Sequence, residues 1–263
     1  MIREDEFLEK IIKNRVPHFN EEFPLILFWS QRSGCTSFVK WFFFQIGQLE
    51  QAISYNPWVH LYEDEVYKNK TNYKSDLITD ILSSKKHTIK LVRNPYKRAV
   101  SSFLILATSK GNFFWEKEWE RIREYFYENE NEDKGISFKQ FLIYIRDSNE
   151  IDPHFSSQYV EGEEHFVKEY VYLEKFEEEI MKIENKYNLK KSPLSLITKS
   201  THHLSPSMTV KGCYSNKEIT NETFWKERSF EFPTYESFYD KETTNLVNEI
   251  FEKDFEVYGY KML

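Results

Sequence analysis

Two junctions between an expected strand and an expected helix constrain the fold of this chain most strongly. The first spans residues 24–47 and the second spans residues 87–106. Each has an apolar run of β-type residues, a short polar turn and then an apolar run with helical spacing. An α/β sheet brings such turns to the carboxyl ends of its strands, where backbone N–H groups and helix N-termini can face an anion. The junctions therefore predict a parallel β-sheet flanked by helices and a ligand with two anionic groups.

The pattern along the rest of the chain is typical of the same α/β class. We expect buried strands at 24–30 and 88–92, a short strand at 171–176, and helices at 37–47, 74–83, 137–147, 177–187 and 243–260. Asn94 and Pro95 predict a helix start, with asparagine as the N-cap and proline as the first helical residue. Residues 108–135 have weak periodicity and read as an insertion or lid, and residues 190–217 read as a loop.

Composition excludes several classes of protein. The 263 residues fit one large α/β domain or two small ones, and the net charge of −7 argues against a general nucleic-acid binder. Cys35 and Cys213 form neither a disulfide framework nor a zinc pattern, which favours a reducing compartment. No stretch approaches the roughly 20 apolar residues of a membrane span. The charged, amphipathic first 14 residues do not resemble a secretory signal.

The first turn carries residues suited to binding a phosphate or a sulfate. Gly34 allows a tight turn close to a ligand, and the N–H groups of residues 34–37 are expected to face an anion. Arg32 can neutralise negative charge that develops on a leaving group. The turn lacks the lysine of a Walker A loop, and no cluster of metal ligands is visible. An ordinary strand-to-helix turn is the alternative interpretation.

The second turn adds Arg93 at the strand end and Ser101 eight residues later. Arginine suits bidentate phosphate binding, and a serine two helical turns further on can complete the anion site. Lys97 and Arg98 lie nearby, so the alternative interpretation is a basic patch on the surface of a helix. Taken together, the two turns indicate an enzyme that uses a bis-phosphorylated nucleotide.

These residues resemble those of sulfotransferases that use 3′-phosphoadenosine 5′-phosphosulfate (PAPS), most closely the carbohydrate-type branch, sulfotransferase family 2. The loop that holds the 5′-phosphosulfate in that family matches Arg32, Ser33, Gly34, Cys35, Thr36 and Ser37. Its 3′-phosphate site matches Arg93 and Ser101 in residue type and spacing. Weaker similarities follow in order at residues 152–158, 172–177 and 251–260, so the resemblance runs from about residue 23 to 261.

The resemblance implies a single sulfotransferase domain over residues 1–263 with a P-loop-like fold. PAPS would be the donor, adenosine 3′,5′-bisphosphate (PAP) the product, and no metal would be required. The acceptor would be a hydroxyl or amine of a saccharide or small molecule, and a bacterial-type cytoplasmic enzyme without the membrane anchor of Golgi relatives is expected. In the loop at 203–214, Lys211 and Gly212 would approach the 3′-phosphate.

The catalytic base is expected to be a histidine, as is usual in this family. His60 ranks first, because it lies after the first helix and before the second nucleotide strand, the region from which related enzymes supply the base. His154 ranks second, because its segment resembles one that lines the acceptor cleft. Glu63 and Asp64 are carboxylate alternatives. A purely structural, hydrogen-bonded histidine is the competing interpretation for either position.

Two other functions stay open. The first is a P-loop kinase or NTPase. Two features argue against it: the first turn lacks the Walker A lysine, and Arg93 stands at the end of the second strand, where such enzymes have an aspartate. A non-catalytic nucleotide-binding or scaffold protein would keep the fold without a base. The aromatic segment at 112–127 is interpreted either as a stacking surface for a ring-shaped acceptor or as a lid helix packed on the core.

Overall fold

The computed structural model describes residues 4–13, 15–108, 112–129, 134–198, 207–219 and 231–263. The chain divides into two compact units, each with its own hydrophobic core. Unit 1 comprises Met1–Arg93 and Gln158–Thr201, and unit 2 comprises Asn94–Ser157 and His202–Leu263. The single domain expected over residues 1–263 stays a prediction.

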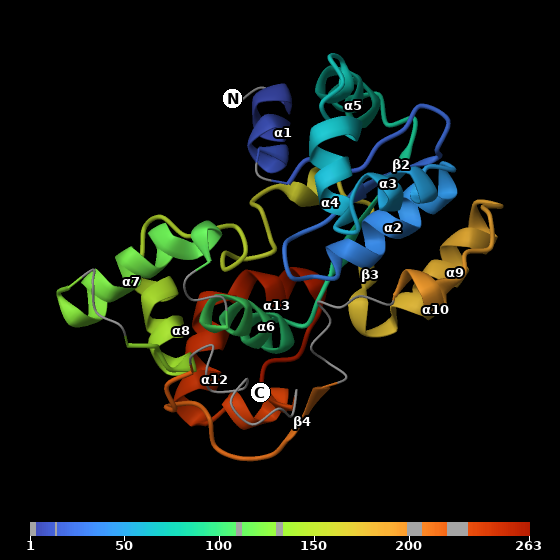
Figure 1. Ribbon diagram of the computed structural model, residues 1–263. Coiled ribbons are helices and arrows are strands. Elements are labelled where there is room, and N and C mark those ends of the chain that lie inside the picture. The colour runs from blue at the N-terminus through green and yellow to red at the C-terminus, as the bar shows by residue number, and fades with distance from the viewer. Residues whose placement is uncertain (1–3, 14, 109–111, 130–133, 199–206, 220–230) are drawn as a thin grey trace. The chain divides into compact units, whose positions relative to one another are not determined.

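A parallel sheet lies at the centre of unit 1 (Figure 1). Its strand order is β1 (Leu25–Phe28), β2 (His87–Val92) and β3 (Glu169–Tyr172). Leu25 pairs with His87, and Ile89 pairs with Glu169. Every residue of β1 is buried, as expected for a parallel strand covered on both faces. The expected α/β class and the two buried strands are confirmed.

Helices surround this sheet within unit 1 (Figure 1). The helical segments are α1 (Glu4–Ile12), α2 (Cys35–Gln45), α3 (Leu49–Tyr55), α4 (Val59–Tyr62), the π-helical turn η1 (Glu63–Tyr67), α5 (Tyr73–Leu82), η3 (Glu163–His165), η4 (Leu173–Lys175), α9 (Phe176–Lys186) and α10 (Leu194–Ile197). Helix α2 packs against α3, α4 and α10, α1 packs against α5, and α9 packs against β3. The strand expected at 171–176 ends at Tyr172, because the chain turns into η4 there.

Unit 2 is mainly helical. Its elements are α6 (Pro95–Ala107), η2 (Phe113–Trp115), α7 (Glu116–Tyr127), α8 (Phe138–Asp147), β4 (Met208–Val210), β5 (Phe232–Pro233), η6 (Tyr235–Phe238), α12 (Lys241–Ile250) and α13 (Glu252–Tyr258). Helices α6, α8 and α12 pack on one another, and β4 pairs with β5 in parallel. Asn94 caps α6 by accepting a hydrogen bond from the Lys97 N–H (3.2 Å), as the sequence predicts.

The structure refines two expectations for this unit. Helix α7 occupies residues 116–127 of the segment at 108–135, and its Trp119 and Ile122 are buried in the core together with Trp115. Packing on the core, rather than stacking on a ligand, therefore describes both tryptophans. The insertion or lid expected at 108–135 stays a prediction. The terminal helix expected at 243–260 is two helices, because the backbone leaves helical geometry at Phe251. No helix in the described part of the chain is long and apolar enough to cross a membrane.

Candidate functional site

The first turn is shaped around Gly34, the residue before α2. Gly34 has φ +94°, and a Cβ atom there would lie 2.4 Å from Cδ1 of Leu173. Ser33 is fully buried, and its hydroxyl accepts from the Ser30 N–H (3.3 Å) and donates to the Ser30 carbonyl. Arg32 also has a positive φ of 65°. The end of β1 and the start of α2 are thus joined by a tight turn that only glycine fits at position 34.

The backbone N–H groups of this turn are arranged as the start of a helix requires. The Ser37 N–H donates to the Gly34 carbonyl at 3.1 Å. The N–H groups of Gly34, Cys35 and Thr36 have no hydrogen-bond partner among the described residues, as is usual for the first turn of a helix. Three N–H groups and the positive end of the α2 dipole are therefore available to an anion.

Arg93 brings a second cation to this turn. It follows β2, is mostly buried, and donates from Nη1 to the Arg32 carbonyl at 2.9 Å. Gln158, which is fully buried, accepts from the Arg93 N–H (2.9 Å) and donates to the Arg93 carbonyl (2.8 Å). Its Oε1 also accepts from the Ser30 hydroxyl at 3.4 Å. Gln158 therefore ties the end of β2 to the end of β1, whereas the sequence suggested that its segment lines an acceptor cleft.

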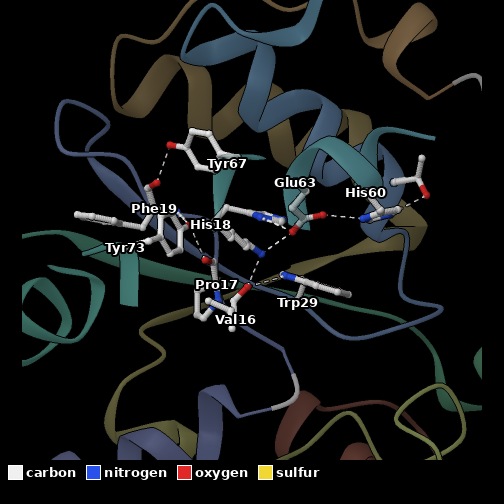
Figure 2. Close-up of polar contacts among 11 residues, drawn as sticks. Val16, Pro17, His18, Phe19, Trp29, His60, Glu63, Tyr67 and Tyr73 are labelled. Atoms are coloured by element: carbon white, nitrogen blue, oxygen red, sulfur yellow. Dashed lines mark hydrogen bonds and ion pairs between the residues drawn. The ribbon is translucent and has the colours of Figure 1, made fainter. Parts of the chain in front are cut away.

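His60 lies beside the same turn (Figure 2). It is on α4, and its Nε2 lies 3.2 Å from the hydroxyl of Thr36. Its Nδ1 lies 2.6 Å from Oε2 of Glu63. The rings of Trp29 and Trp58 flank the imidazole, with centroids 6.1 Å and 5.9 Å away. The structure thus brings the first-ranked histidine to the expected turn, although 24 residues separate His60 from Thr36 in sequence.

Glu63 is the centre of a buried polar cluster (Figure 2). Only 1% of its side chain is exposed. Besides His60, it contacts His18, whose Nδ1 lies 3.1 Å from Oε1, and the ammonium group of Lys68. Lys68 also donates to the carbonyl of Val16 at 2.5 Å. The sequence offered Glu63 as an alternative base, and it gave no indication of His18 or Lys68.

The cluster shifts the pKa values of its members in different directions. Burial alone would raise the pKa of Glu63, but Lys68 and His18 hold it well below its usual value. Burial, reinforced by Lys68, lowers the pKa of His18 to about 4. Burial also opposes the charged form of His60, but Cys35 and Glu63 outweigh this effect and raise its pKa to about 10. His18 is therefore neutral near pH 7, whereas His60 is a cation.

Cys35 is the partner of His60 on the α2 side. Burial opposes ionisation of its thiol, but the positive charges of His60 and Arg32 outweigh burial and lower its pKa. The side chain is half-buried at the first position of α2. A thiol with enhanced acidity therefore lies in the turn that is expected to bind the anion.

Unit 2 contains the remaining predicted site residues. Ser101 is buried on α6, and Lys211 and Gly212 are exposed after β4, where the Gly212 N–H donates to the Ser237 hydroxyl at 3.1 Å. His154 has its Nδ1 2.7 Å from Oδ1 of Asp152. The other loop residues expected to cover the nucleotide, 203–206, lie outside the described residues.

Two further residues correct or extend the interpretation of this unit. The ring of His154 packs edge-on against those of Phe114 and Trp115. Arg98 is buried, and its guanidinium donates to the carbonyls of Ser156 (2.7 Å) and Pro153 (3.4 Å). Arg98 is therefore a structural residue that holds the segment around His154, and it does not form a surface basic patch with Lys97.

The described residues contain no group of three or more His, Cys, Asp or Glu side chains positioned to hold a metal ion.

Comparison with known proteins identifies the family. A model of the sulfotransferase family matches residues 19–261, which is nearly the whole chain and includes both turns. No curated protein and no solved structure matches the chain. The range matched is close to the range of about 23 to 261 over which the sequence itself shows the resemblance. The chain therefore belongs to the sulfotransferase family, in the family 2 branch that its sequence indicates.

Proposed function

We propose that this sulfotransferase moves a sulfuryl group from PAPS to a hydroxyl or amine of a saccharide or small-molecule acceptor and releases PAP. Family membership supports sulfuryl transfer in general. The observation that carries the donor assignment is the first turn, where three N–H groups without partners among the described residues lie beside two arginines. Such a site matches a dianionic or more highly charged group better than a neutral one.

The residues of the turn fit the donor in shape as well as charge. Because a Cβ atom at Gly34 would collide with Leu173, only glycine fits the tight turn that presents these N–H groups. We assign the 5′-phosphosulfate to residues 32–37 and the 3′-phosphate to Arg93 and Ser101. Lys211 and Gly212 are proposed as a further contact with the 3′-phosphate. When bound, PAPS supplies the sulfuryl group that is transferred.

His60 is proposed as the base, with Nε2 accepting the proton of the acceptor. Because the pKa of His60 is raised to about 10, only a small fraction is neutral near pH 7. Turnover should therefore increase as pH rises toward 10. Arg32 would stabilise negative charge on the departing phosphate. His154 is the second candidate for the base, supported by the Asp152 carboxylate at its Nδ1.

The acceptor and the cellular location belong to the same proposal. The carbohydrate-type resemblance supports a saccharide. The free thiols of Cys35 and Cys213 support a reducing, cytoplasmic location in a bacterial-type cell.

A thermal-shift titration with PAP tests the donor site. A ligand that binds only the folded state raises the melting temperature as its concentration increases. At a ligand concentration of 100 times Kd, the free energy of unfolding increases by about 2.7 kcal/mol. We expect this rise for the wild type and for Lys97→Ala, which removes an exposed cation four residues from Arg93. Arg93→Ala should lose most of it.

The outcomes of this titration separate the possible functions. No rise with PAP in the wild type would contradict the donor assignment. A rise with ATP and Mg²⁺ in its place would favour the kinase or NTPase interpretation. A rise with PAP but no transfer from PAPS to any acceptor tested would favour a non-catalytic nucleotide-binding protein.

A further inference from the structure

We infer that Glu63 is a positioning residue for His60, fixing the imidazole with Nδ1 toward the carboxylate and Nε2 toward the first turn, and that Lys68 holds Glu63 in place. The inference rests on the proposed role of His60 as the base. It adds a residue that acts through His60, and it removes Glu63 from the list of alternative bases.

The local backbone brings the two side chains together. His60 lies on α4, and Glu63 is the first residue of the π-helical turn η1 that continues it. Residues three positions apart on a helical segment share a face, which explains the 2.6 Å separation between Nδ1 and Oε2. The Nε2 atom, on the opposite edge of the ring, consequently lies 3.2 Å from the Thr36 hydroxyl.

The two oxygens of Glu63 have separate partners. Oε2 lies against His60, whereas Oε1 lies against Lys68 and is 3.1 Å from Nδ1 of His18. Because Oε1 is occupied, the carboxylate cannot rotate without breaking the ion pair with Lys68. The cluster therefore fixes the direction of Oε2, and Oε2 fixes the direction of the imidazole ring.

The partners of Glu63 are themselves anchored. Lys68 donates to the Val16 carbonyl, and its ammonium lies 5.5 Å from the centre of the Trp29 ring. His18 is fully buried, with its ring stacked on those of Trp29 and Phe42. A buried carboxylate is destabilising unless it is paired, and Lys68 supplies the pairing charge. Glu63 is thus a permanent anion, which agrees with the direction of its pKa shift.

This arrangement suits a base that must accept a proton at Nε2. A carboxylate that accepts from Nδ1–H selects the tautomer whose Nε2 lone pair is available. It also stabilises the imidazolium once the proton has arrived. A neutral residue in place of Glu63 would leave the ring free to adopt the other tautomer and would weaken its basicity.

The first test follows the titration of His60 directly, by NMR of histidine-labelled protein, with His60→Gln to assign its signal. Glu63→Gln should lower the pKa of His60 by more than about one unit, because the charged imidazole loses its carboxylate partner. One unit corresponds to about 1.4 kcal/mol of differential interaction. Glu65→Gln removes a neighbouring exposed carboxylate of η1 and should change it far less. An unchanged His60 pKa in Glu63→Gln would overturn the inference.

The effects of other charged groups on the pKa of His60 must be distinguished from the effect of Glu63. Cys35 on α2, Asp64 on η1 and the buried His18 all interact electrostatically with His60. Arg32 acts on Cys35, and Lys68 acts on Glu63. The titration is therefore repeated in a Cys35→Ser background. If Glu63→Gln shifts the pKa of His60 only when Cys35 is present, the effect belongs to the thiol and the inference fails.

The second test measures the pH dependence of kcat/KM. In Glu63→Gln the rise of kcat/KM with pH should occur at lower pH, following the lowered pKa of His60. The value of kcat/KM reached above that pKa should fall about 10²-fold, because removing an orienting carboxylate gives large losses in analogous dyads. Affinity for PAP should not change. The NMR titration needs no turnover, so it tests the role of Glu63 even if no transfer is detected. A failure of the proposed function can therefore be distinguished from a failure of the inference about Glu63.

A double variant separates the loss of positioning from a loss of stability. Glu63→Gln leaves the mostly buried Lys68 without its carboxylate partner, and breaking one side of a buried pair is destabilising. Glu63→Gln/Lys68→Met removes both charges. We expect the double variant to fold and to show the same lowered His60 pKa and reduced plateau. Recovery of wild-type values would mean that Glu63 only neutralises Lys68, which contradicts a positioning role.

Discussion

Gly34 is the residue on which the geometry of the first turn most directly depends. Its φ of +94° lies in the left-handed region, and its Cα faces Leu173 at a distance that leaves no space for a methyl group. The sequence predicted the need for a glycine near a ligand. The contact with Leu173, from the segment after β3, is decided only by the fold.

Gly34→Ala should therefore be destabilising for two additive reasons. An alanine with positive φ costs about 1–2 kcal/mol, and forcing it against Leu173 adds about 1–3 kcal/mol. Gly259→Ala is the matched control, because Gly259 has φ +68° but no atom within 4 Å of the added methyl group. Urea unfolding should show a clearly larger loss for Gly34→Ala. Equal losses would mean that Leu173 moves aside freely.

At the scale of single elements, α7 shows why weak sequence periodicity is a poor guide. Much of its surface is charged, yet Trp119 and Ile122 are buried, while Phe113, just before it, is 91% exposed. A short apolar stripe is enough to dock a helix when its members are large, because one buried tryptophan removes a large apolar area from water.

Trp119→Ala and Phe113→Ala test whether this segment belongs to the core of unit 2. Trp119→Ala should lower the free energy of unfolding by about 3–5 kcal/mol, as for other large core truncations. Phe113→Ala should change it by less than about 0.5 kcal/mol. The measurement is urea denaturation followed by circular dichroism. Near-equal stability of the two variants would indicate a lid that detaches from the core.

At the scale of the whole molecule, the buried His18 couples stability to pH. Its pKa is about 4 in the folded protein and 6.5 in the reference state, so the unfolded chain binds more protons between these values. The contribution of His18 is present above pH 6.5 and is lost as pH falls toward 4. Glu63 and Cys35, whose pKa values are also lowered, act in the same direction.

We therefore expect the free energy of unfolding to fall between pH 6.5 and 4, with His18 accounting for roughly 3 kcal/mol at about 1.4 kcal/mol per unit. In His18→Gln the slope over this range should be smaller, whatever its absolute stability. His165→Gln, which replaces an exposed histidine, should keep the wild-type slope. An unchanged slope in His18→Gln would contradict the neutral, buried state of this ring.

The local parts of the site could be predicted from sequence. The N-cap at Asn94, the strand-to-helix turn at Gly34 and the end of α2 before Gly47 follow from residue preferences that act over a few positions. The role of Arg98 could not, because a buried arginine and a surface arginine look alike in sequence. Its guanidinium is satisfied by the carbonyls of Ser156 and Pro153, more than 50 residues away.

The sequence by itself determined the α/β class, the two turns with Arg32 and Arg93, and the family, because hydrophobic periodicity and turn chemistry are local properties. Only the tertiary structure decided which distant residues meet. It brought His60 to Thr36, surrounded Glu63 with His18 and Lys68, and linked the ends of β1 and β2 through Gln158. Those contacts depend on which helices cover which strands, and this is fixed by burial of the whole apolar surface and not by any one segment.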